Sequence, residues 1–305
     1  MKWERLGPIF NVEGRSAWMH SHAYLPTAHQ VDSERIRVFL AFRDEHQVGR
    51  LGWIDVLASD PRAVIAVSET PALDVGLPGT FDDNGVTPLA VVPDGDRLRM
   101  YYAGWQLTPR ARYLLFTGLA FSEDGGDTFT RHQHTPVLDR NPEEFVVRTG
   151  AHVMRDNDGL WKIWYAAGSG FVETGNKQVP TYQMAYLESS NGLSWPGPST
   201  IVMTPRVPDE YGFGRPHIRK NNGVYEMWYS ARSHSKGYSI GYATSSDGLN
   251  WDRRDDQLGL APSPSGWDSE MTCFASIVEN HHGTFMFYNG NGFGLTGVGV
   301  ARLQK

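Results

Sequence analysis

The chain has a single cysteine, Cys273, among its 305 residues, so no disulfide can form within it and no cysteine-based zinc site can be built. It also lacks any apolar run close to the ~20 residues needed to cross a bilayer. Basic residues are fewer than acidic ones, with 28 Lys and Arg and 34 Asp and Glu. The net charge of −6 disfavours binding to nucleic-acid phosphates. The opening residues MKWERLGPIF lack the apolar stretch of a secretory signal, so we predict a soluble, cytoplasmic protein.

No apolar period of 3.6 residues is sustained over three turns, so the sequence does not support long amphipathic helices. The 33 glycines and 18 prolines are scattered between short apolar segments and do not form a linker. Many tight turns between short strands produce this distribution. Hydrophobic residues make up 40% of the chain, enough for a large core, and we predict an all-β protein.

One strand-like segment recurs about every 60 residues, which is the sequence signature of a repeat architecture. Met100, Ile163, Met227 and Met286 hold equivalent places and are separated by 63, 64 and 59 residues. A second apolar segment precedes each copy and a third follows it. Five repeats of three or four strands predict a five-bladed β-propeller forming one domain, residues 1–305. The copies are RVFLAFR (37–43), RLRMYYAGW (97–105), LWKIWYAAGS (160–169), VYEMWYSARS (224–233) and TFMFYNGNG (284–292).

The last repeat stops at Leu303, before its fourth strand, whereas residues 3–10 resemble the fourth-strand segments 129–138 and 251–260. We therefore expect residues 3–10 to supply the outer strand of the last blade and to close the ring. The segment SEDGGDTF (122–129) resembles the Asp-box turn of sialidases. We expect its role to be structural, with aspartate binding turn amides and the aromatic residue packing inward.

Acidic residues precede four of the five inner strands at a nearly constant distance. In a propeller, the loop that enters the first strand of a blade and the loop that leaves its second strand open on the same face. Neighbouring carboxylates raise one another's pKa, which suits acid and base catalysis on a sugar. We therefore predict that four acids surround a funnel: Asp83, Glu144, Glu210 and Glu270.

The same face should receive aromatic and polar side chains from the strand ends. An aromatic platform with arginine, histidine and asparagine donors suits a sugar, because its ring faces are apolar and its edges carry hydroxyls. His152 and His217 could equally be satisfied histidines inside the tunnel, and we expect neither a metal nor a cofactor. The candidate substrate-binding residues are Arg43, Trp105, His152, Phe171, Arg215, His217, Arg232, Asn289 and Asn291.

Five blades with carboxylates at a funnel resemble the propeller glycoside hydrolases of families 43, 32, 68, 117 and 130. Four segments are more similar still to uncharacterised propeller proteins that accompany genes of sugar and polysaccharide biosynthesis. The resemblance covers essentially the whole chain. The segments that carry it are FDDNGVTP (81–88), Arg215-Pro216-His217, GWDSEM (266–271) and YNGNGFGLTGVGVARL (288–303).

In these hydrolases, blade one carries an aspartate base or nucleophile, blade two a stabilising aspartate and blade three a glutamate that acts as the acid. The resemblance places Asp83 at the second position and Glu144 at the third. Blade one of this chain departs from the pattern, because RSAWMHSHA (15–23) has no carboxylate and His20 or His22 stands nearest. Hydrolysis needs a base for water, or a nucleophile, opposite the acid. His22 therefore joins the candidate catalytic residues.

Three functions stay open. The first is a glycoside hydrolase acting on a small glycoside, with Glu144 as acid and Asp83 tuning its pKa. The second is a sugar or nucleoside lyase or dehydratase, in which a histidine and a carboxylate move the protons. A phosphorylase is a variant of it, with phosphate held by Arg43, Arg215 and Arg232, as the likeness to family 130 implies. The third is a propeller that binds carbohydrate without catalysis. Each has a small sugar, glycoside or nucleoside as partner, no nucleic acid and no membrane; the oligomeric state is open.

Overall fold

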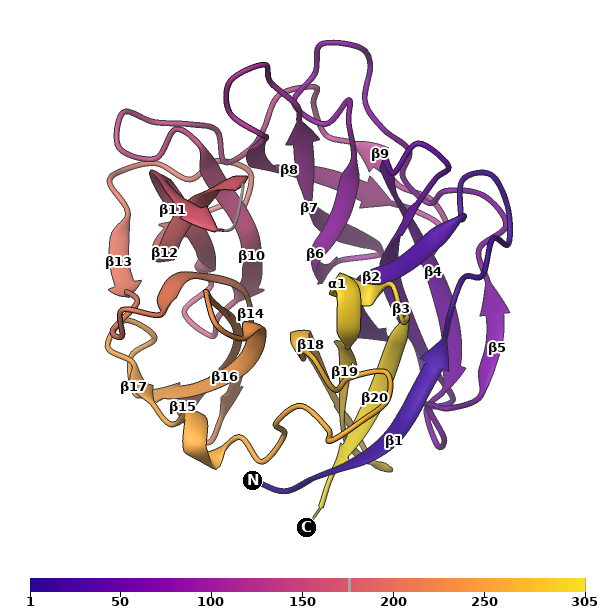
Figure 1. The fold of residues 1–305 in the computed structure, drawn as a ribbon. Helices are drawn as coiled ribbons and strands as arrows, with labels where there is room; N and C mark the ends of the chain where they lie inside the picture. Colours follow the sequence, from indigo (N-terminus) through magenta and orange to yellow (C-terminus); the bar gives the residue numbers. More distant parts are fainter. Residues whose placement is uncertain (175–176, 305) are drawn as a thin grey trace.

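The structure is a computed structural model that describes residues 1–174 and 177–304, and its regular secondary structure is almost entirely β-strand (Figure 1). The strands are arranged in groups of consecutive strands, which we call runs. Within a run, strands that follow one another along the chain pair antiparallel. Helical structure in the described residues is limited to the 3-10 turn η1 (Asp255–Gln257) and to α1 (Asn291–Gly294). No helix of this part of the chain is long and apolar enough to span a membrane.

The first two runs of strands each contain four members. The first run forms a separate sheet of β2 (Ser21–Gln30), β3 (Arg35–Arg43), β4 (Gly49–Leu57) and β5 (Val64–Val67). The second run contains β6 (Val86–Asp94), β7 (Arg97–Gln106), β8 (Leu114–Ser122) and β9 (Thr130–Arg131).

The second, third and fourth runs belong to one twelve-stranded sheet, because parallel pairings join β8 to β10 and β12 to β14. The third run contains β10 (Val147–Arg155), β11 (Trp161–Thr174), β12 (Lys177–Ser189) and β13 (Thr200–Met203). The fourth run contains β14 (Glu210–Asn221), β15 (Val224–Ser233), β16 (Gly237–Ser245) and β17 (Asp252–Arg253).

The last run joins the two ends of the chain. It contains β18 (Cys273–Asn280), β19 (Gly283–Asn289) and β20 (Val298–Leu303), and β1 (Trp3–Phe10) completes the sheet in the order β1-β20-β19-β18. Trp3 lies opposite Leu303 and Phe10 opposite Val298. The pairing predicted for residues 3–10 is therefore present.

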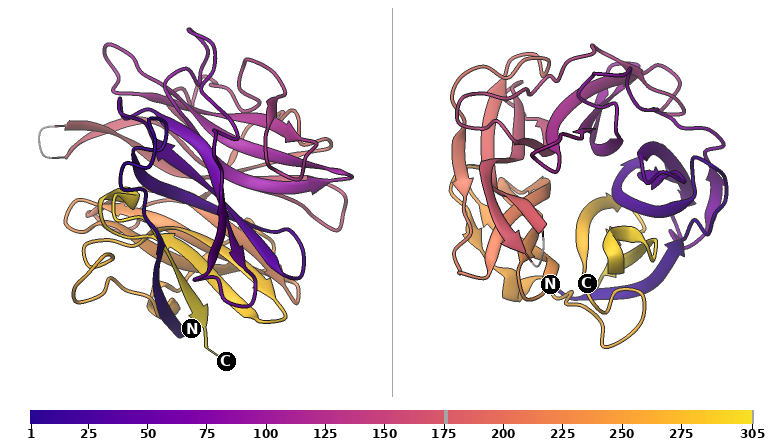
Figure 2. Two further views of the ribbon diagram at one scale, coloured as in Figure 1. Left: turned by 90° about the vertical axis from the view of Figure 1, so that its right-hand side faces the viewer. Right: turned by 45° about the horizontal axis from the view of Figure 1, so that its top comes forward.

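The first strands of the five runs surround a common centre (Figure 2, right). Strand β2 contacts β6, β6 contacts β10, β10 contacts β14, β14 contacts β18, and β18 contacts β2. Apolar side chains fill the space between adjacent runs: Tyr101, Trp161, Tyr165 and Trp195, for example, pack between the second and third. Burial of such surface, at about 25 cal/mol per Å², is the main stabilising contribution in this fold.

The turns follow from their residue types. Asn222 and Gly223 join β14 to β15 with φ of +49° and +81°, the left-handed backbone that a two-residue hairpin turn requires. Asp124 accepts hydrogen bonds from the Thr128 amide at 3.0 and 3.1 Å, and Phe129 is buried, as the Asp-box resemblance predicts. The equivalent pairs are Asn191 with Trp195 and Asp247 with Trp251.

Deleting residues 1–12 should destabilise the whole protein. Trp3, Phe10 and Val12 are buried, and removing β1 would also leave β20 as an unpaired edge. We expect the free energy of unfolding to fall by at least about 4 kcal/mol, from the loss of three apolar side chains from the core. Chemical denaturation measures this loss. Removal of only Met1 and Lys2, both exposed, serves as the control; an unchanged midpoint for the longer deletion would contradict the prediction.

Candidate functional site

The inner strands of the five runs share a β-bulge, where the register with the second strand shifts. In four of them the first bulged residue has a positive φ: +57° at Leu25, +65° at Gly150, +51° at Arg215 and +59° at Phe274. This backbone is strained for a residue with a side chain, and a bulge re-aims the side chain it carries. These four residues, together with Leu89 from the bulge of β6, line one cavity.

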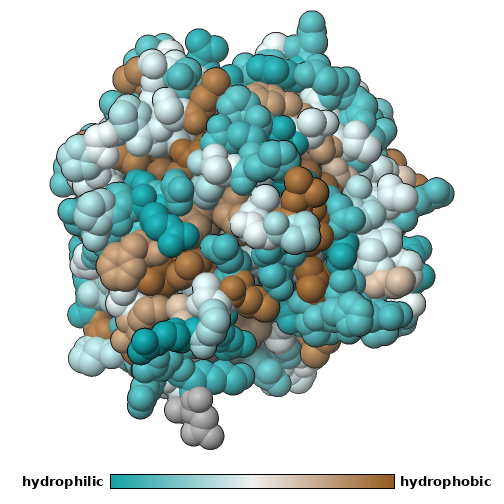
Figure 3. All heavy atoms as spheres, turned by 90° about the horizontal axis from the view of Figure 1, so that it is seen from above, coloured by the Kyte–Doolittle hydropathy of each residue, from teal (hydrophilic) through white to brown (hydrophobic). Residues whose placement is uncertain are grey.

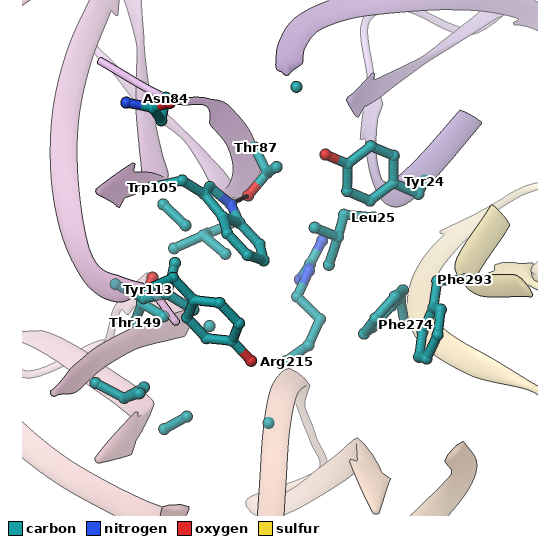
Figure 4. Close-up of a pocket in the computed structure, with 18 of the residues that line it drawn as sticks. Tyr24, Leu25, Asn84, Thr87, Trp105, Tyr113, Thr149, Arg215, Phe274 and Phe293 are labelled. Atoms are coloured by element: carbon teal, nitrogen blue, oxygen red, sulfur yellow. Dashed lines mark hydrogen bonds between the residues drawn. The ribbon is translucent and has the colours of Figure 1, made fainter. Parts of the chain in front are cut away.

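The cavity has a volume of about 540 Å³, which lies within the range of small-molecule sites. Trp105 and Tyr113 lie on one side of it with ring centroids 5.1 Å apart, and Phe274 and Phe293 lie on the other (Figure 4). Seen from above, the surface of the molecule is mainly hydrophilic, and hydrophobic residues gather near its centre (Figure 3). A ligand in the cavity would meet aromatic rings from two directions.

The charged lining of the cavity is of one sign. Arg43, Arg112, Arg215 and Arg232 line it, whereas no aspartate or glutamate does so among the residues that the structure describes. None of these arginines takes part in a salt bridge within residues 1–174 and 177–304. Four guanidinium groups without a salt-bridge partner in the described residues give the cavity a positive charge, although the protein as a whole has a net charge of −6.

Arg215 is the most constrained of the four. It is 3% exposed, and its Nη2 donates to the Pro26 carbonyl oxygen at 2.8 Å and to Thr27 Oγ1 at 2.5 Å. Its Nε is buried without a hydrogen-bond partner in the described structure. Burial lowers the pKa of the Arg215 guanidinium to about 9, and it stays charged at neutral pH. Figure 4 shows this side chain between the two aromatic sides of the cavity.

Arg232 is surrounded by tyrosines. Its guanidinium lies 4.7 to 5.3 Å from the ring centroids of Tyr182, Tyr211 and Tyr238, a cation–π arrangement. Its Nη1 donates to the Tyr182 hydroxyl at 2.6 Å, and the hydroxyls of Tyr182 and Tyr238 are 3.0 Å apart. Both tyrosines line the cavity, so this network presents hydroxyl groups beside the arginines.

The four acids expected at the funnel do not line the cavity. Asp83 accepts hydrogen bonds from the Gly79 amide and from Asn84 Nδ2, both at 2.8 Å. Glu210 forms a bidentate ion pair with Arg253, at 2.6 and 2.9 Å. Glu270 is exposed. None of the four acids is therefore a lining residue of this cavity, and both their predicted place around a funnel and their catalytic roles stay predictions.

Glu144 is buried for a structural reason. It is 5% exposed; its Oε2 lies 2.6 Å from Arg148 Nε and accepts a hydrogen bond from the Tyr165 hydroxyl at 2.9 Å. Ser199 donates to its other oxygen. The Glu144 carboxylate is thus bound by three protein groups and is not among the lining residues of the cavity.

The same arrangement recurs in four of the five runs, and we call it the tyrosine–carboxylate–arginine cluster. In each, a tyrosine at one fixed position of the second strand donates its hydroxyl to a carboxylate at 2.7 to 3.0 Å, and an arginine pairs with that carboxylate. Burial raises the pKa of all four tyrosines, so they remain donors. The clusters are Tyr102–Asp82–Arg131, Tyr165–Glu144–Arg148, Tyr229–Asp255–Arg253 and Tyr288–Asp268–Arg5.

The first run has Phe42 where the others have this tyrosine. Phe42 is fully buried and has no hydroxyl, so it needs no carboxylate. The first run therefore has no such cluster in the described residues, and the predicted replacement of the blade-one catalytic carboxylate by a histidine stays a prediction.

Comparison with known proteins found no matching family model. The chain is 31% identical, over all 305 residues and over the full length of the relative, to the uncharacterized protein Rv1502 of Mycobacterium tuberculosis (strain ATCC 25618 / H37Rv). The chain belongs to the Rv1502 family. The uncharacterized protein MT1551 of the CDC 1551 / Oshkosh strain matches with the same identity and coverage.

Solved structures with a similar fold include glycoside hydrolases. A glycosyl hydrolase from Bacteroides ovatus gives a TM-score of 0.74 at 15% identity, covering 98% of this chain and 92% of its own. A thermostable family-43 glycoside hydrolase gives 0.69 at 17% identity, covering 92% and 88%. A structure from the GH130 family of mannoside phosphorylases and hydrolases gives 0.70 at 15% identity, covering 98% and 92%. These similarities show that the chain has the fold of the propeller glycoside hydrolases.

The three predicted histidines, His22, His152 and His217, are not among the lining residues of the cavity. His152 and His217, whose ring centroids are 5.0 Å apart, follow the bulges on β10 and β14. Burial, and then nearby cations, lower the pKa of His152 to about 3 and of His22 to about 4. A neutral imidazole at His152 fits the alternative that this residue is a buried histidine inside the tunnel and does not bind the substrate. No group of three or more potential metal ligands occurs in the described residues.

The side chains of the two predicted asparagines form hydrogen bonds with backbone groups. Asn289 is fully buried; its Nδ2 donates to the Ala23 carbonyl oxygen at 2.7 Å and its Oδ1 accepts from the Leu25 amide at 2.9 Å, linking the last run to the first. Asn291 accepts from the Glu270 amide at 2.7 Å. Phe171 is exposed on β11, away from the cavity lining.

Four predicted substrate-binding residues do line the cavity: Arg43, Trp105, Arg215 and Arg232. The sequence interpretation missed Tyr113 and Phe293, which come from irregular segments, and Phe274. The sequence did contain a signal for Phe274. It occupies the same place in its repeat as Arg215, since each is followed directly by the second bulged residue, Ala275 or Pro216.

Proposed function

We propose that this protein is a carbohydrate-active enzyme whose substrate is a small sugar derivative bearing a phosphate or carboxylate group. The observation that carries the proposal is the cavity lining, with four arginines and no carboxylate among the described residues. Guanidinium groups bind phosphate and carboxylate oxygens through paired, charge-assisted hydrogen bonds. Aromatic side chains such as Trp105 pack against the apolar face of a sugar ring.

We also infer that the five strand runs are the blades of one closed propeller domain. The circle of contacts among β2, β6, β10, β14 and β18 supports this inference, and so does the pairing of β1 with β20. In such a ring the bulged residues of every blade converge on one central cavity, which is where they are found.

The reaction that fits this cavity does not use a pair of carboxylates. Inverting and retaining glycosidases place two carboxyl groups about 5 to 9.5 Å apart around the scissile bond, and the lining offers none. Elimination or phosphate-dependent cleavage is more compatible with it, since arginines neutralise the anion and tyrosines can move protons. Tyr24, Tyr113, Tyr182 and Tyr238 are the lining residues with a suitable hydroxyl.

Hydrolysis of a glycoside is the second candidate, supported by the likeness of the fold to glycoside hydrolases. A panel of neutral and anionic glycosides, assayed with and without phosphate in oxygen-18 water, separates the two. Solvent label in the released sugar would favour hydrolysis, whereas an unlabelled unsaturated or phosphorylated product supports our proposal. Binding of anionic sugars without any turnover would assign the protein as a binding propeller.

Asp83→Asn should leave turnover of the true substrate within about two-fold of the wild-type rate, because Asp83 binds Gly79 and Asn84 and does not line the cavity. Initial rates at saturating substrate measure the effect. Arg232→Met, which removes a lining charge, is the positive control and should lower kcat/KM by at least ten-fold. A large loss for Asp83→Asn would restore the carboxylate mechanism.

A further inference from the structure

The two aromatic sides of the cavity are separate surfaces, and this separation limits the ligand. Trp105 at the end of β7 packs against Tyr113, with the two rings tilted by 59°. Phe274 on β18 and Phe293 on α1 each pack against Tyr238, with centroids 5.5 and 5.4 Å apart. Phe293 is 41% exposed, so part of its ring is available to a ligand. Arg215 projects between the two surfaces (Figure 4).

A ligand that matches this order has a ring at each end and an anionic group between them. A single sugar phosphate would cover one aromatic surface and leave the other in contact with water. Nucleobases stack on aromatic side chains through their flat faces, sugars through their apolar faces, and a diphosphate binds arginine guanidinium groups. Building on the proposed function, we infer that the cavity binds a nucleoside diphosphate sugar.

The polar groups beside Trp105 indicate which side of the cavity binds the nucleobase. Asn84 and Thr87 line the cavity on this side. Asn84 Nδ2 donates to Asp83 Oδ1 at 2.8 Å, and the Asn84 side-chain carbonyl oxygen accepts no hydrogen bond within the described residues. That oxygen can accept from the edge of a base stacked on the indole. The sugar would then lie towards Phe274 and Phe293.

Calorimetric titration of the full chain tests the inference. The ligands are UDP-glucose, dTDP-glucose, CDP-glucose, ADP-glucose and GDP-mannose, each compared with its sugar 1-phosphate and its nucleoside monophosphate. We expect at least one nucleotide sugar to bind ten-fold or more tightly than either of its parts. A sugar 1-phosphate that binds as tightly as every nucleotide sugar would overturn this inference but leave the proposed function intact. Absence of binding by every anionic ligand would overturn both.

Trp105→Ala should lower the affinity for that nucleotide sugar by about ten-fold while changing the affinity for the sugar 1-phosphate by less than two-fold, because only the nucleotide stacks on the indole. Trp105→Phe, which keeps an aromatic face, should recover most of the affinity. Phe171→Ala removes an exposed aromatic ring outside the cavity lining and should change neither. Melting temperatures confirm that each variant is folded. An equal loss for both ligands in Trp105→Ala would place the sugar, not the base, on this side.

Discussion

Arg215→Met is expected to weaken the binding of anionic sugars by about 100-fold and, at the same time, to raise the stability of the free protein. Binding suffers because the charge at the centre of the cavity is lost, and hydrogen bonds to charged groups contribute about 1.5 to 3 kcal/mol. Stability rises because a buried guanidinium without a carboxylate partner is costly to desolvate. A residue that stabilises the complex but destabilises the fold is typical of a functional site.

The gain in stability should be modest and should depend on pH. Arg215 donates to the Pro26 carbonyl oxygen and to Thr27, and both lose this donor, so we expect about 1 to 2 kcal/mol. Burial lowers the pKa of the folded guanidinium to about 9 from the ordinary 12.5. The charge therefore destabilises the fold fully below about pH 9, and this penalty shrinks as pH rises towards 12.5, where the unfolded guanidinium also loses its proton. Urea denaturation at pH 7 and pH 10 measures the difference.

Arg219→Met is the matched control. Arg219 lies on the same strand, outside the cavity lining, and pairs with Glu226 at 2.7 Å and Glu279 at 2.6 Å. Its replacement should leave ligand affinity unchanged and should not raise stability. If Arg215→Met bound anionic sugars as tightly as the wild type, the cavity would not be the anion site.

The strand pattern could be predicted from the sequence because it depends on local properties. The repeat of Met100, Ile163, Met227 and Met286 reflects buried positions on the second strands, and all four are fully buried. The likeness of residues 3–10 to other outer strands predicted the pairing with β20, since side-chain alternation fixes which residues pack inward.

The chemistry of the acids could not be predicted in the same way. Asp82 and Asp83 are neighbours, but successive side chains point in different directions, and only Asp82 reaches Tyr102. A sequence shows that an acid precedes a strand; it does not show whether the partner of that acid is a ligand or a buried tyrosine. Tyr113 and Phe293 were missed because Tyr113 lies between two strands and Phe293 lies in the four-residue α1, and neither segment is long enough to show a periodic pattern.

The tyrosine–carboxylate–arginine clusters carry the second large prediction. Asp82 is fully buried, and its Oδ2 is 3.0 Å from the Tyr102 hydroxyl and 2.8 Å from Arg131 Nε. Asp82→Ala would leave both groups without their acceptor. Breaking a buried ion pair on one side costs about 3 to 5 kcal/mol, and we expect a loss of this size in urea denaturation.

The first run of strands, β2 to β5, provides the reciprocal experiment. Phe42→Tyr would place a hydroxyl at a fully buried position that has no carboxylate partner in the described residues. This change should lower the free energy of unfolding by about 1 to 3 kcal/mol. Tyr102→Phe makes the opposite change in the second run, on β7. In the Asp82→Ala background it should cost little or even restore stability, because the hydroxyl no longer has an acceptor. Additive losses for Asp82→Ala and Tyr102→Phe would show that the two groups act independently. The carboxylate could then no longer be explained as the partner of the tyrosine, and its place before the inner strand would again need a role in catalysis.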